Sequence, residues 1–396
     1  MKSIFILGAS MLQVPAIKKA KEKGLFVYVL DYNPDAVGIQ YADKFLCIST
    51  IDKQAVYEAA LEYKPDYIIT STSDMPVSTA AWVNEKLGKK TDISYENSIC
   101  ATNKLFMRDR LKEKGVAIPL YFKCHSEQEF LDAIKHFENK FIVKPCDNAA
   151  SRGVIFVDKT KENNFSEIYN YSKSFSRSGD ILVEEFMEGD EVSVESFTIN
   201  GHTEVITITD KLVTPLPYFV ELGHTEPSRH SREIQKQIQE LAINAISAIG
   251  IITGPSHTEI KITPNGVKIV EIAARLGGDF ITSKLVPLST GVDLIEASIN
   301  AVIGEKVDLK KTKRCGSAIR YITSKPGIIK KIENIEEAKI LPGIIEIEFY
   351  QSIGDTVVEL TNSSERVGHV IAIGKDANEA EANCQKAMSL IKISLD

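Results

Sequence analysis

The chain has 396 residues, more than one hydrophobic core usually serves, so two or three domains are expected. Its composition, 43% hydrophobic and 26% charged, is that of an ordinary globular protein and excludes a disordered or fibrous one. The net charge is −7, with 47 basic and 54 acidic residues and no dense block of lysine and arginine, so nucleic acid is not an expected partner.

Strand and helix patterns alternate over the first 96 residues. Helix patterns, one of them over residues 53–63, separate continuous apolar runs of the kind that form buried strands; these runs occupy residues 3–8, 25–30 and 67–70. Strands that alternate with helices form a parallel sheet with helices on both faces. The sequence therefore predicts a doubly wound, Rossmann-like domain over residues 1–96.

The turn after the first apolar run invites comparison with dinucleotide-binding sites. Their fingerprint needs three glycines so that the backbone and a helix can approach a pyrophosphate, and only Gly8 is present here. Asp31, which closes the second run, is interpreted as the end of a strand. We therefore predict an ordinary strand-to-helix turn at Gly8.

An α+β pattern begins at residue 97. An amphipathic helix over 104–114 precedes apolar runs at 141–145, 154–157 and 181–186, and from residue 191 apolar side chains recur in period two, as on antiparallel strands. Two further runs, 256–262 and 268–272, are joined by Asn265-Gly266, a strong hairpin signal. Strand and helix signals resume near Lys311 at shorter spacing. We expect a central domain over 97–300, with a nucleotide-binding lid over about 118–188, and a small α+β domain over 301–396.

The N-terminus, the apolar runs and the cysteines bear on location. The start MKSIFILGAS has one lysine and no small-residue cleavage site, so a signal peptide does not fit. No apolar stretch approaches the roughly 20 residues that span a bilayer, so no membrane attachment is expected. The six cysteines stand singly, without a CxxC pair, as is typical of reduced thiols. The sequence predicts a cytoplasmic protein.

A small-residue loop follows the strand that ends at Lys144. It reads DNAASRGV over residues 147–154. Backbone N–H groups in such a turn form an anion-binding concavity, and the lysine supplies a compact charge for phosphates. A solvated β-turn with an incidental lysine explains the pattern equally well, so both interpretations stay open.

Acidic residues end the next strand, in VEEFMEGDE over residues 183–191. Such residues usually face water. A crossover between two strands can also offer a backbone amide and carbonyl to an adenine edge, with a carboxylate placed for ribose hydroxyls. The spacing alone does not decide between these interpretations.

Two glutamates face each other across the predicted hairpin. Glu259 lies in its first strand and Glu271 at the end of its second. Mg²⁺ prefers one or two protein carboxylates, with phosphate oxygens and water completing the octahedron. Arg275 follows closely and suits charge that develops on a transferring phosphoryl group. The alternative is a solvated surface pair, which the apolar residues before Glu271 disfavour because a half-buried carboxylate needs a partner.

These motifs, taken in order, resemble the signature of the ATP-grasp superfamily: Lys104, Lys144, the DNAASRGV loop, VEEFMEGDEVSVE, Lys211, Glu259 and EIAARLGGD. The resemblance covers essentially the whole chain, because residues 1–96 are similar to the domain that precedes the ATP-grasp fold in carboxylate-amine ligases. Within the superfamily the chain looks most like the L-amino-acid ligases, on the strength of residues 217–224 (PYFVELGH) and the small C-terminal domain.

The resemblance implies a role for each matching position. For the nucleotide, it implies phosphate ligands at Lys104 and Lys144, a loop over the triphosphate at Ser151, Arg152 and Gly153, an adenine hinge at Glu184, Glu185, Phe186 and Met187, and a ribose carboxylate at Glu191. For the chemistry, it implies a γ-phosphate ligand at Lys211, metal ligands at Glu259 and Glu271, and contacts to the acyl phosphate from Arg275 and Gly278, with Ser151, Lys211 and Arg275 as the catalytic set.

Two features qualify this pattern. Many members have an asparagine where this chain has Ala273, so the second metal ion would depend more on Glu271 and phosphate oxygens. The matching Glu221 and His224 border the amino-acid pocket in relatives, which implies an ammonium ligand and a ligand for a carboxylate or tetrahedral oxygen. A polar loop in which Gly223 only sets a turn is the alternative.

The resemblance implies an ATP-dependent ligase that activates a carboxylate as an acyl phosphate and joins it to an amine. It also implies ATP and Mg²⁺, with Mn²⁺ as a substitute, small carboxylate and amine substrates, and a homodimer. Ser73 and Asp74, at the end of a strand, are expected to contribute to substrate choice. Two alternatives stay open: a bicarbonate-activating carboxylase, as in biotin carboxylase or carbamoyl-phosphate synthesis, and a non-catalytic regulator that binds ATP.

Overall fold

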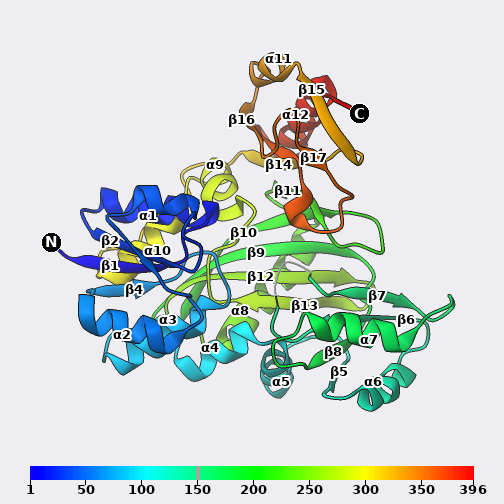
Figure 1. The fold of residues 1–396 in the computed structure, drawn as a ribbon, viewed down its shortest axis with the longest axis horizontal. Helices are drawn as coiled ribbons and strands as arrows, with labels where there is room; N and C mark the ends of the chain where they lie inside the picture. The colour runs from blue at the N-terminus through cyan, green and yellow to red at the C-terminus, as the bar shows by residue number, and fades with distance from the viewer. Residues whose placement is uncertain (149–151) are drawn as a thin grey trace.

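The N-terminal segment folds as a four-stranded parallel sheet in the order β3-β2-β1-β4 (Figure 1), in a computed structural model that describes residues 1–148 and 152–396. The strands are β1 (Ser3–Leu7), β2 (Phe26–Asp31), β3 (Lys44–Cys47) and β4 (Tyr67–Ile69). The accompanying helices are η1 (Met11–Gln13), α1 (Val14–Glu22), η2 (Val37–Tyr41), α2 (Lys53–Tyr63) and α3 (Pro76–Lys86). The predicted doubly wound parallel sheet is confirmed.

The turn after β1 is more specific than the sequence suggested. The Ala9 amide donates to the Asp31 carboxylate at 2.8 Å, so Asp31 does not simply end β2. Gly8 has φ of +108°, a backbone region that favours glycine. Together these contacts fix how the chain leaves β1 toward the centre of the molecule.

A small antiparallel sheet carries the predicted lid, in the order β5-β8-β6-β7. Its strands are β5 (Tyr121–Cys124), β6 (Lys140–Pro145), β7 (Ile155–Asp158) and β8 (Ile181–Glu185), accompanied by α6 (Glu127–Ala133), η3 (Ile134–His136) and α7 (Phe165–Ser174). Phe130 and Phe141 are fully buried in a core that belongs to this unit alone. Helices α4 (Tyr95–Thr102) and α5 (Lys104–Glu113) connect it to the N-terminal sheet.

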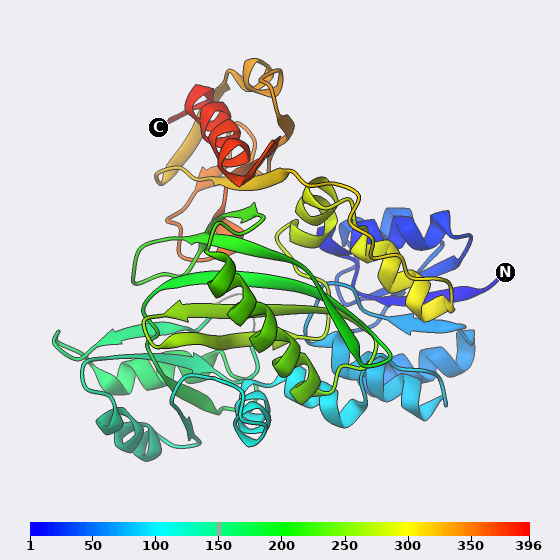
Figure 2. The same cartoon turned by 180° about the vertical axis from the view of Figure 1, so that it is seen from behind.

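An eight-stranded sheet forms the centre, in the order β13-β12-β9-β10-β11-β14-β18-β16. Its central strands are β9 (Asp190–Ile199), β10 (His202–Val213), β11 (Glu221–Glu226), β12 (Gly254–Thr263) and β13 (Gly266–Ala273). The predicted hairpin at Asn265-Gly266 is confirmed, because β12 and β13 pair antiparallel around it. The 18-residue helix α8 (Arg232–Ile249), which the sequence patterns above do not include, covers the back of this sheet (Figure 2).

The C-terminal segment extends the same sheet with β14 (Gly316–Ile322), β16 (Ile344–Phe349) and β18 (Gly368–Gly374), backed by α12 (Ala377–Leu390). Its remaining elements are β15 (Gly327–Glu333), α11 (Ile335–Lys339), β17 (Thr356–Val357), η5 (Ser363–Glu365) and β19 (Lys392–Leu395). The C-terminal part is therefore joined to the central sheet through backbone hydrogen bonds, and it stands above that sheet in Figure 1. The exact division into three domains stays a prediction.

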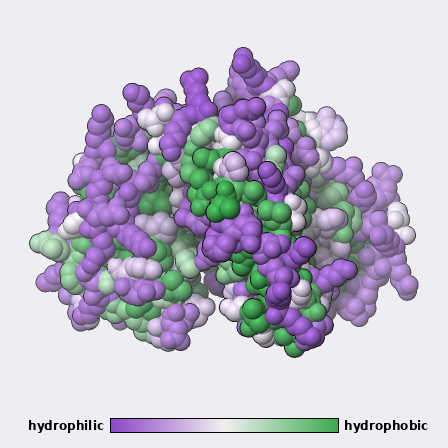
Figure 3. Space-filling model, turned by 90° about the horizontal axis from the view of Figure 1, so that it is seen from above, coloured by the Kyte–Doolittle hydropathy of each residue, from purple (hydrophilic) through white to green (hydrophobic). Residues whose placement is uncertain are grey.

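A short connection returns the chain to the N-terminal sheet before the C-terminal part begins. It contains the π-helix η4 (Ile281–Leu285), α9 (Val286–Ser289) and α10 (Leu294–Ile303), and α10 packs against α1 in a shared core. Within the described ranges, no single helix is long and apolar enough to cross a membrane, and only the pair 281–289 and 294–303, bent by 110°, passes that test of length and composition. Seen from above, hydrophilic residues cover most of the surface (Figure 3).

Candidate active site

A cleft opens between the lid sheet and the central sheet. It encloses about 960 Å³ of space, part of it open to solvent. Apolar side chains, cations and glutamates all line it; those named by the sequence patterns or adjacent to them are Lys104, Ile142, Lys144, Arg152, Val154, Glu184, Glu185, Phe186, Met187, Glu191, Lys211, Val270, Glu259 and Glu271. A cleft that combines apolar side chains with lysines suits a flat base linked to a polyphosphate.

Lys144 lies at the floor of the cleft in a buried ion-pair group. Its Nζ is 2.6 Å from Glu184 Oε2, and Arg108 donates to both Glu184 oxygens at 2.7 and 3.2 Å. Burial lowers the pKa of Lys144, and the nearby cations lower it further against the pull of Glu184. Burial alone would raise the Glu184 pKa, but the two cations hold it at about 2.

Arg108 is a residue that the sequence did not single out. Its side chain is 1% exposed and also donates to the Val270 carbonyl at 2.7 Å. An arginine within an amphipathic helix pattern is normally a surface residue, so no local signal marked it. The Glu184 side chain belongs to this buried group; its predicted part in an adenine hinge, which would use backbone atoms, stays a prediction.

The other residues predicted to bind the nucleotide from the lid also make contacts within the protein. The Glu185 carboxylate accepts from Lys268 Nζ at 2.8 Å, and its backbone N–H donates to the Leu120 carbonyl at 2.8 Å. Phe186 packs edge-on against Phe156, with ring centroids 4.7 Å apart. Gly153 has φ of +78° and lies against Phe175, where a Cβ would collide. Ser151 lies outside the described residues.

Lys104 connects the N-terminus of α5 to the predicted metal ligands. Its Nζ donates to Glu271 Oε1 and to the Asn148 carbonyl, both at 2.9 Å. Burial would lower the Lys104 pKa, but Glu271 and more distant carboxylates raise it. The Lys104 ammonium group therefore lies where the sequence predicts a phosphate group and a metal ion.

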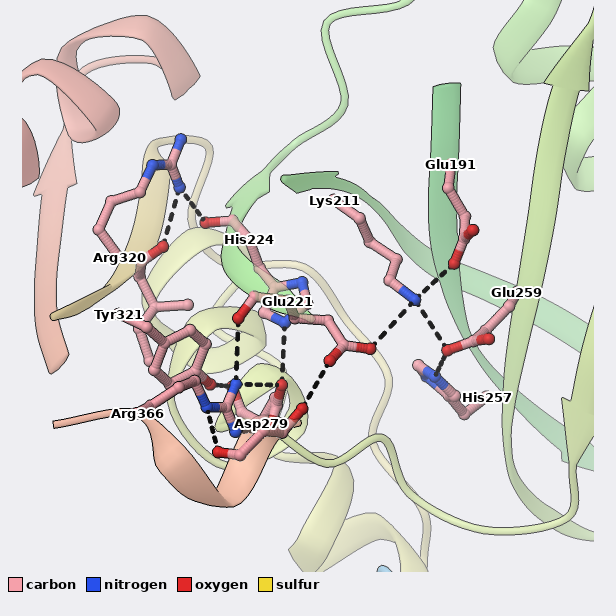
Figure 4. A network of polar contacts seen from close by, with 12 residues as sticks. Glu191, Lys211, Glu221, His224, His257, Glu259, Asp279, Arg320, Tyr321 and Arg366 are labelled. Atoms are coloured by element: carbon pink, nitrogen blue, oxygen red, sulfur yellow. Dashed lines mark hydrogen bonds and ion pairs between the residues drawn. The ribbon is translucent and has the colours of Figure 1, made fainter. Parts of the chain in front are cut away.

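Lys211 occupies the junction between the cleft and a second cavity. Figure 4 shows its Nζ among three carboxylates: Glu191 at 2.6 Å, Glu259 at 2.9 Å and Glu221 at 3.7 Å. These side chains meet because β12, β9, β10 and β11 are successive neighbours in the sheet. Burial would lower the Lys211 pKa, but the carboxylates raise it well above its usual range. Lys211 is thus a permanent cation at this junction.

The two predicted metal ligands lie opposite each other in the hairpin. Glu259 and Glu271 are direct cross-strand partners, and both line the cleft and the second cavity. Each is paired with a lysine, so both carboxylates are oriented toward cations. Two carboxylates beside open space fit the donor set that Mg²⁺ takes when phosphate oxygens and water complete its shell. Ala273 also lines the second cavity and supplies no ligand atom there.

A buried histidine next to Glu259 was missed in the sequence. His257 Nδ1 lies 2.5 Å from Glu195 Oε1, and its Nε2 lies 3.6 Å from Glu259 Oε1. Burial would lower the His257 pKa, but Glu195 raises it to about 9. A Cβ at Gly277 would meet both side chains within 2.9 Å, which explains the glycine there. The period-two pattern, which places His257 on the same face as Glu259, was the available signal.

The second cavity opens at the edge of the N-terminal sheet. Arg275 donates to both oxygens of Asp74 at 2.6 and 3.0 Å, so this arginine connects the end of β13 to the segment between β4 and α3. The cavity lining includes Thr72, Asp74, Ser193, Lys211, Glu221, His224, His257, Arg275, Gly278, Asp279 and Ser363. The structure therefore brings the four predicted substrate residues Glu221, His224, Arg275 and Gly278 to one cavity, beside the cleft.

Two polar atoms on residues of this cavity lack an internal partner. His224 Nδ1 and Ser193 Oγ are buried and have no hydrogen bond to any described residue. Glu221, in contrast, accepts from Ser363 Oγ at 2.9 Å. Residues that line the cavity thus include paired charges and two buried polar atoms without a hydrogen bond in the described part of the chain.

Two family models match parts of this chain. The ATP-grasp domain family matches residues 137–283, and the L-amino acid ligase C-terminal domain 2 family matches residues 320–396. An uncharacterized protein of Sinorhizobium fredii is 28% identical over 298 residues, 74% of this chain and 61% of the relative. An L-arginine-specific L-amino acid ligase of Bacillus subtilis is 25% identical over 350 residues, 87% of this chain and 82% of the relative.

The fold as a whole is similar to that of a solved structure. The crystal structure of an L-amino acid ligase from Bacillus licheniformis superposes with a TM-score of 0.82 at 20% identity, covering 100% of this chain and 99% of that one. The match includes the N-terminal sheet and the C-terminal part, which lie outside the matched ATP-grasp segment.

Proposed function

We propose, on the premise of its ATP-grasp domain and its L-amino acid ligase C-terminal domain, that the chain activates an amino-acid carboxylate as an acyl phosphate and joins it to an amine. The observation that carries the proposal is the position of Lys211. Its ammonium group lines both the nucleotide cleft and the second cavity, within 3.7 Å of carboxylates from three neighbouring strands. A γ-phosphate drawn to Lys211 would lie beside a substrate in that cavity.

The acid is proposed to be an amino acid because of Glu221. In an amino acid the ammonium group and the carboxylate are joined by one carbon, so a group that binds the ammonium must stand next to the reacting phosphate. Glu221 Oε1 lies 3.7 Å from Lys211 Nζ, which meets this requirement. When Lys211 turns to a phosphate, Glu221 is left to pair with the α-ammonium group of the substrate.

In the first step, a carboxylate oxygen of the donor amino acid attacks the γ-phosphorus of ATP, the new C–O–P linkage forms, and ADP leaves with the electrons of the broken P–O bond. Lys104, Lys144 and Lys211 bind and orient the triphosphate, which brings the reactants into line. In the second step, the nitrogen of the amine attacks the acyl carbon. The C–O bond to phosphate breaks, phosphate leaves, and the nitrogen gives up its proton.

Metal binding is proposed at Glu259 and Glu271. Mg²⁺ held there would neutralise phosphate charge during transfer, and Mn²⁺ is proposed to substitute because it accepts the same oxygen ligands. Both glutamates are held by lysines in this structure, so these lysines are expected to move onto phosphate oxygens when the metal enters. A cytoplasmic location and a homodimer stay predictions.

One experiment tests the ligase and its alternatives together. Phosphate release is measured with Mg-ATP over a panel of amino acids, short carboxylates and bicarbonate, with hydroxylamine added to trap an acyl phosphate as the hydroxamate. We expect phosphate release and hydroxamate with amino acids. Phosphate release with bicarbonate alone would instead indicate a carboxylase, and ATP binding without turnover on any acid would indicate the non-catalytic regulator.

A further inference from the structure

An arginine of the C-terminal part reaches the amino-acid cavity. Arg366 follows the short helix η5 and donates from Nη1 and Nη2 to the two Asp279 oxygens, both at 2.9 Å. Its Nε donates to the Ser363 carbonyl at 2.8 Å, and its guanidinium lies 3.6 Å from the centre of the Tyr321 ring. Arg366 is 8% exposed. Its planar group is thus held by several contacts, and Figure 4 shows Arg366 beside Asp279 at the lower left.

Asp279 is held in an unfavourable backbone conformation. Its φ is +49°, and that of Phe280 is +62°, so two consecutive residues other than glycine occupy the left-handed region. They are followed by the π-helix η4, an element that frequently marks functional sites. Such a conformation is costly for a residue with a side chain and persists where the surrounding structure requires it. Here the requirement is a carboxylate that lines the cavity and meets Arg366.

Asp279 also connects Arg366 to a substrate residue. Its Oδ2 lies 3.4 Å from Nε2 of His224, which is 2% exposed and lines the same cavity. Ser363, three residues before Arg366, donates to Glu221 at 2.9 Å. Both predicted substrate residues, Glu221 and His224, are therefore held by the segment 363–366, one directly and one through Asp279.

Arg366 also changes the net charge that Asp279 presents to the cavity. Paired with a bidentate arginine, Asp279 presents a neutral ion pair to the cavity. Without that arginine, the same half-buried carboxylate would line the cavity with His224 as its remaining side-chain contact among the described residues. A half-buried carboxylate that has lost its bidentate partner attracts another cation, and an amino acid with a basic side chain brings one.

We propose that Arg366 is a positioning residue of the amino-acid site: through Asp279 it fixes His224, and by neutralising Asp279 it selects donor amino acids whose side chains carry no positive charge. This inference rests on the proposed function, because it assigns a substrate class to that same site. It also makes the C-terminal part a wall of the cavity, so that the matched ATP-grasp segment alone lacks a complete amino-acid site.

The test uses the full chain and the hydroxamate assay, in which hydroxylamine takes the place of the amine. R366A is expected to raise KM for uncharged donor amino acids about tenfold or more, the usual loss for one charge-assisted contact, while KM for ATP stays unchanged. The preferred donor should shift toward lysine and arginine. Adding guanidinium ion should restore the original preference in R366A, since it refills the vacated position, whereas sodium chloride at the same concentration should not.

A matched control separates positioning from simple domain attachment. Arg229 also joins the central sheet to the C-terminal part, with Nη1 2.6 Å from Glu381 Oε2, but its side chain is 44% exposed and does not line the cavity. R229A is therefore expected to leave donor preference and KM unchanged. In the double variant R366A/D279N the carboxylate is gone, so the shift toward basic donors should disappear.

The outcomes are distinct. Equal losses in R366A and R229A, or a loss in R366A that is the same for all donors and not restored by guanidinium, would overturn the inference while the ligase assignment stands. A wild-type chain that forms no hydroxamate with any amino acid would overturn the proposed function, and the inference with it. If R366A does not fold, R366K supplies the readout: it keeps the charge but not the fork, and an unchanged donor KM in R366K would count against the inference.

Discussion

Replacing Glu184 by glutamine should remove the charge that holds two buried cations beneath the nucleotide cleft. Glu184 is 3% exposed and lies between Arg108 and Lys144. The fall of its pKa from 4.5 to about 2 corresponds to about 3 kcal/mol of stability at neutral pH, at about 1.4 kcal/mol for each tenfold change in proton affinity. We therefore expect E184Q to lower the free energy of unfolding by about that amount.

The pH dependence gives the prediction a sign. A carboxyl group whose pKa is depressed by folding stabilises the protein above its unfolded pKa of about 4.5, and this contribution is lost as the pH falls toward about 2. The difference between wild type and E184Q, measured by urea unfolding, should thus be largest near neutral pH and shrink in acid. E185Q is the matched control on the same strand, because Glu185 pairs with Lys268 while 35% exposed and a pair of that kind contributes at most about 1 kcal/mol.

E184Q should weaken ATP binding as well as stability. Without Glu184, the buried Lys144 has Arg108 and Lys104 as nearby cations and no ion-pair partner among the described residues, so its ammonium form is less stable. ATP should bind more weakly to E184Q than to E185Q, as measured by calorimetry. Equal destabilisation in the two variants, or a difference that does not change between neutral and acid pH, would refute the reasoning.

Three further predictions follow from the other charged groups. E271Q should abolish ATP-dependent phosphate release while far-UV circular dichroism stays unchanged, and normal turnover in this variant would count against the metal assignment. K211M should reduce phosphate release by about 100-fold or more, since it removes a preorganised cation at the reacting phosphate, whereas K236M, at a side chain that is 76% exposed, should not. Glu226 is fully buried between Thr209 and Ser289, and burial raises its pKa to about 8. The free energy of unfolding of the wild type should therefore fall as the pH rises from about 4.5 to about 8. E226Q resembles the neutral acid, so its free energy of unfolding, measured with urea, should not show this fall. Parallel pH dependences in the two proteins would contradict the raised pKa of Glu226.

Much of the fold follows from local sequence pattern. The strands of the N-terminal sheet are short apolar runs between helix patterns, and the β12–β13 hairpin is specified by Asn265-Gly266. These signals depend on neighbouring residues alone, so the chain carries them without reference to the rest of the structure. Helix α8 shows where this reasoning ends, because no prediction was made for a segment that lay between two groups of strands.

The candidate site divides in the same way. The order of the lysines and glutamates, from Lys104 to Glu271, predicted a nucleotide site, and the structure brings these residues to the walls of one cleft. Nucleotide binding in that cleft stays a prediction. The ion-pair partners of the site residues could not be predicted from the sequence. Arg108 and Glu184 are 76 residues apart, and Arg366 and Asp279 are 87 apart, so no spacing along the chain could pair them.

The sequence by itself determined which chemical groups this protein has and in what order they follow the strands and helices. Tertiary structure decided which of those groups are charged, paired and aimed at one cavity. The physical reason is that an ion pair depends on the distance between its members and on the water excluded around them. Both quantities arise only when the lid, the central sheet and the C-terminal part have packed together.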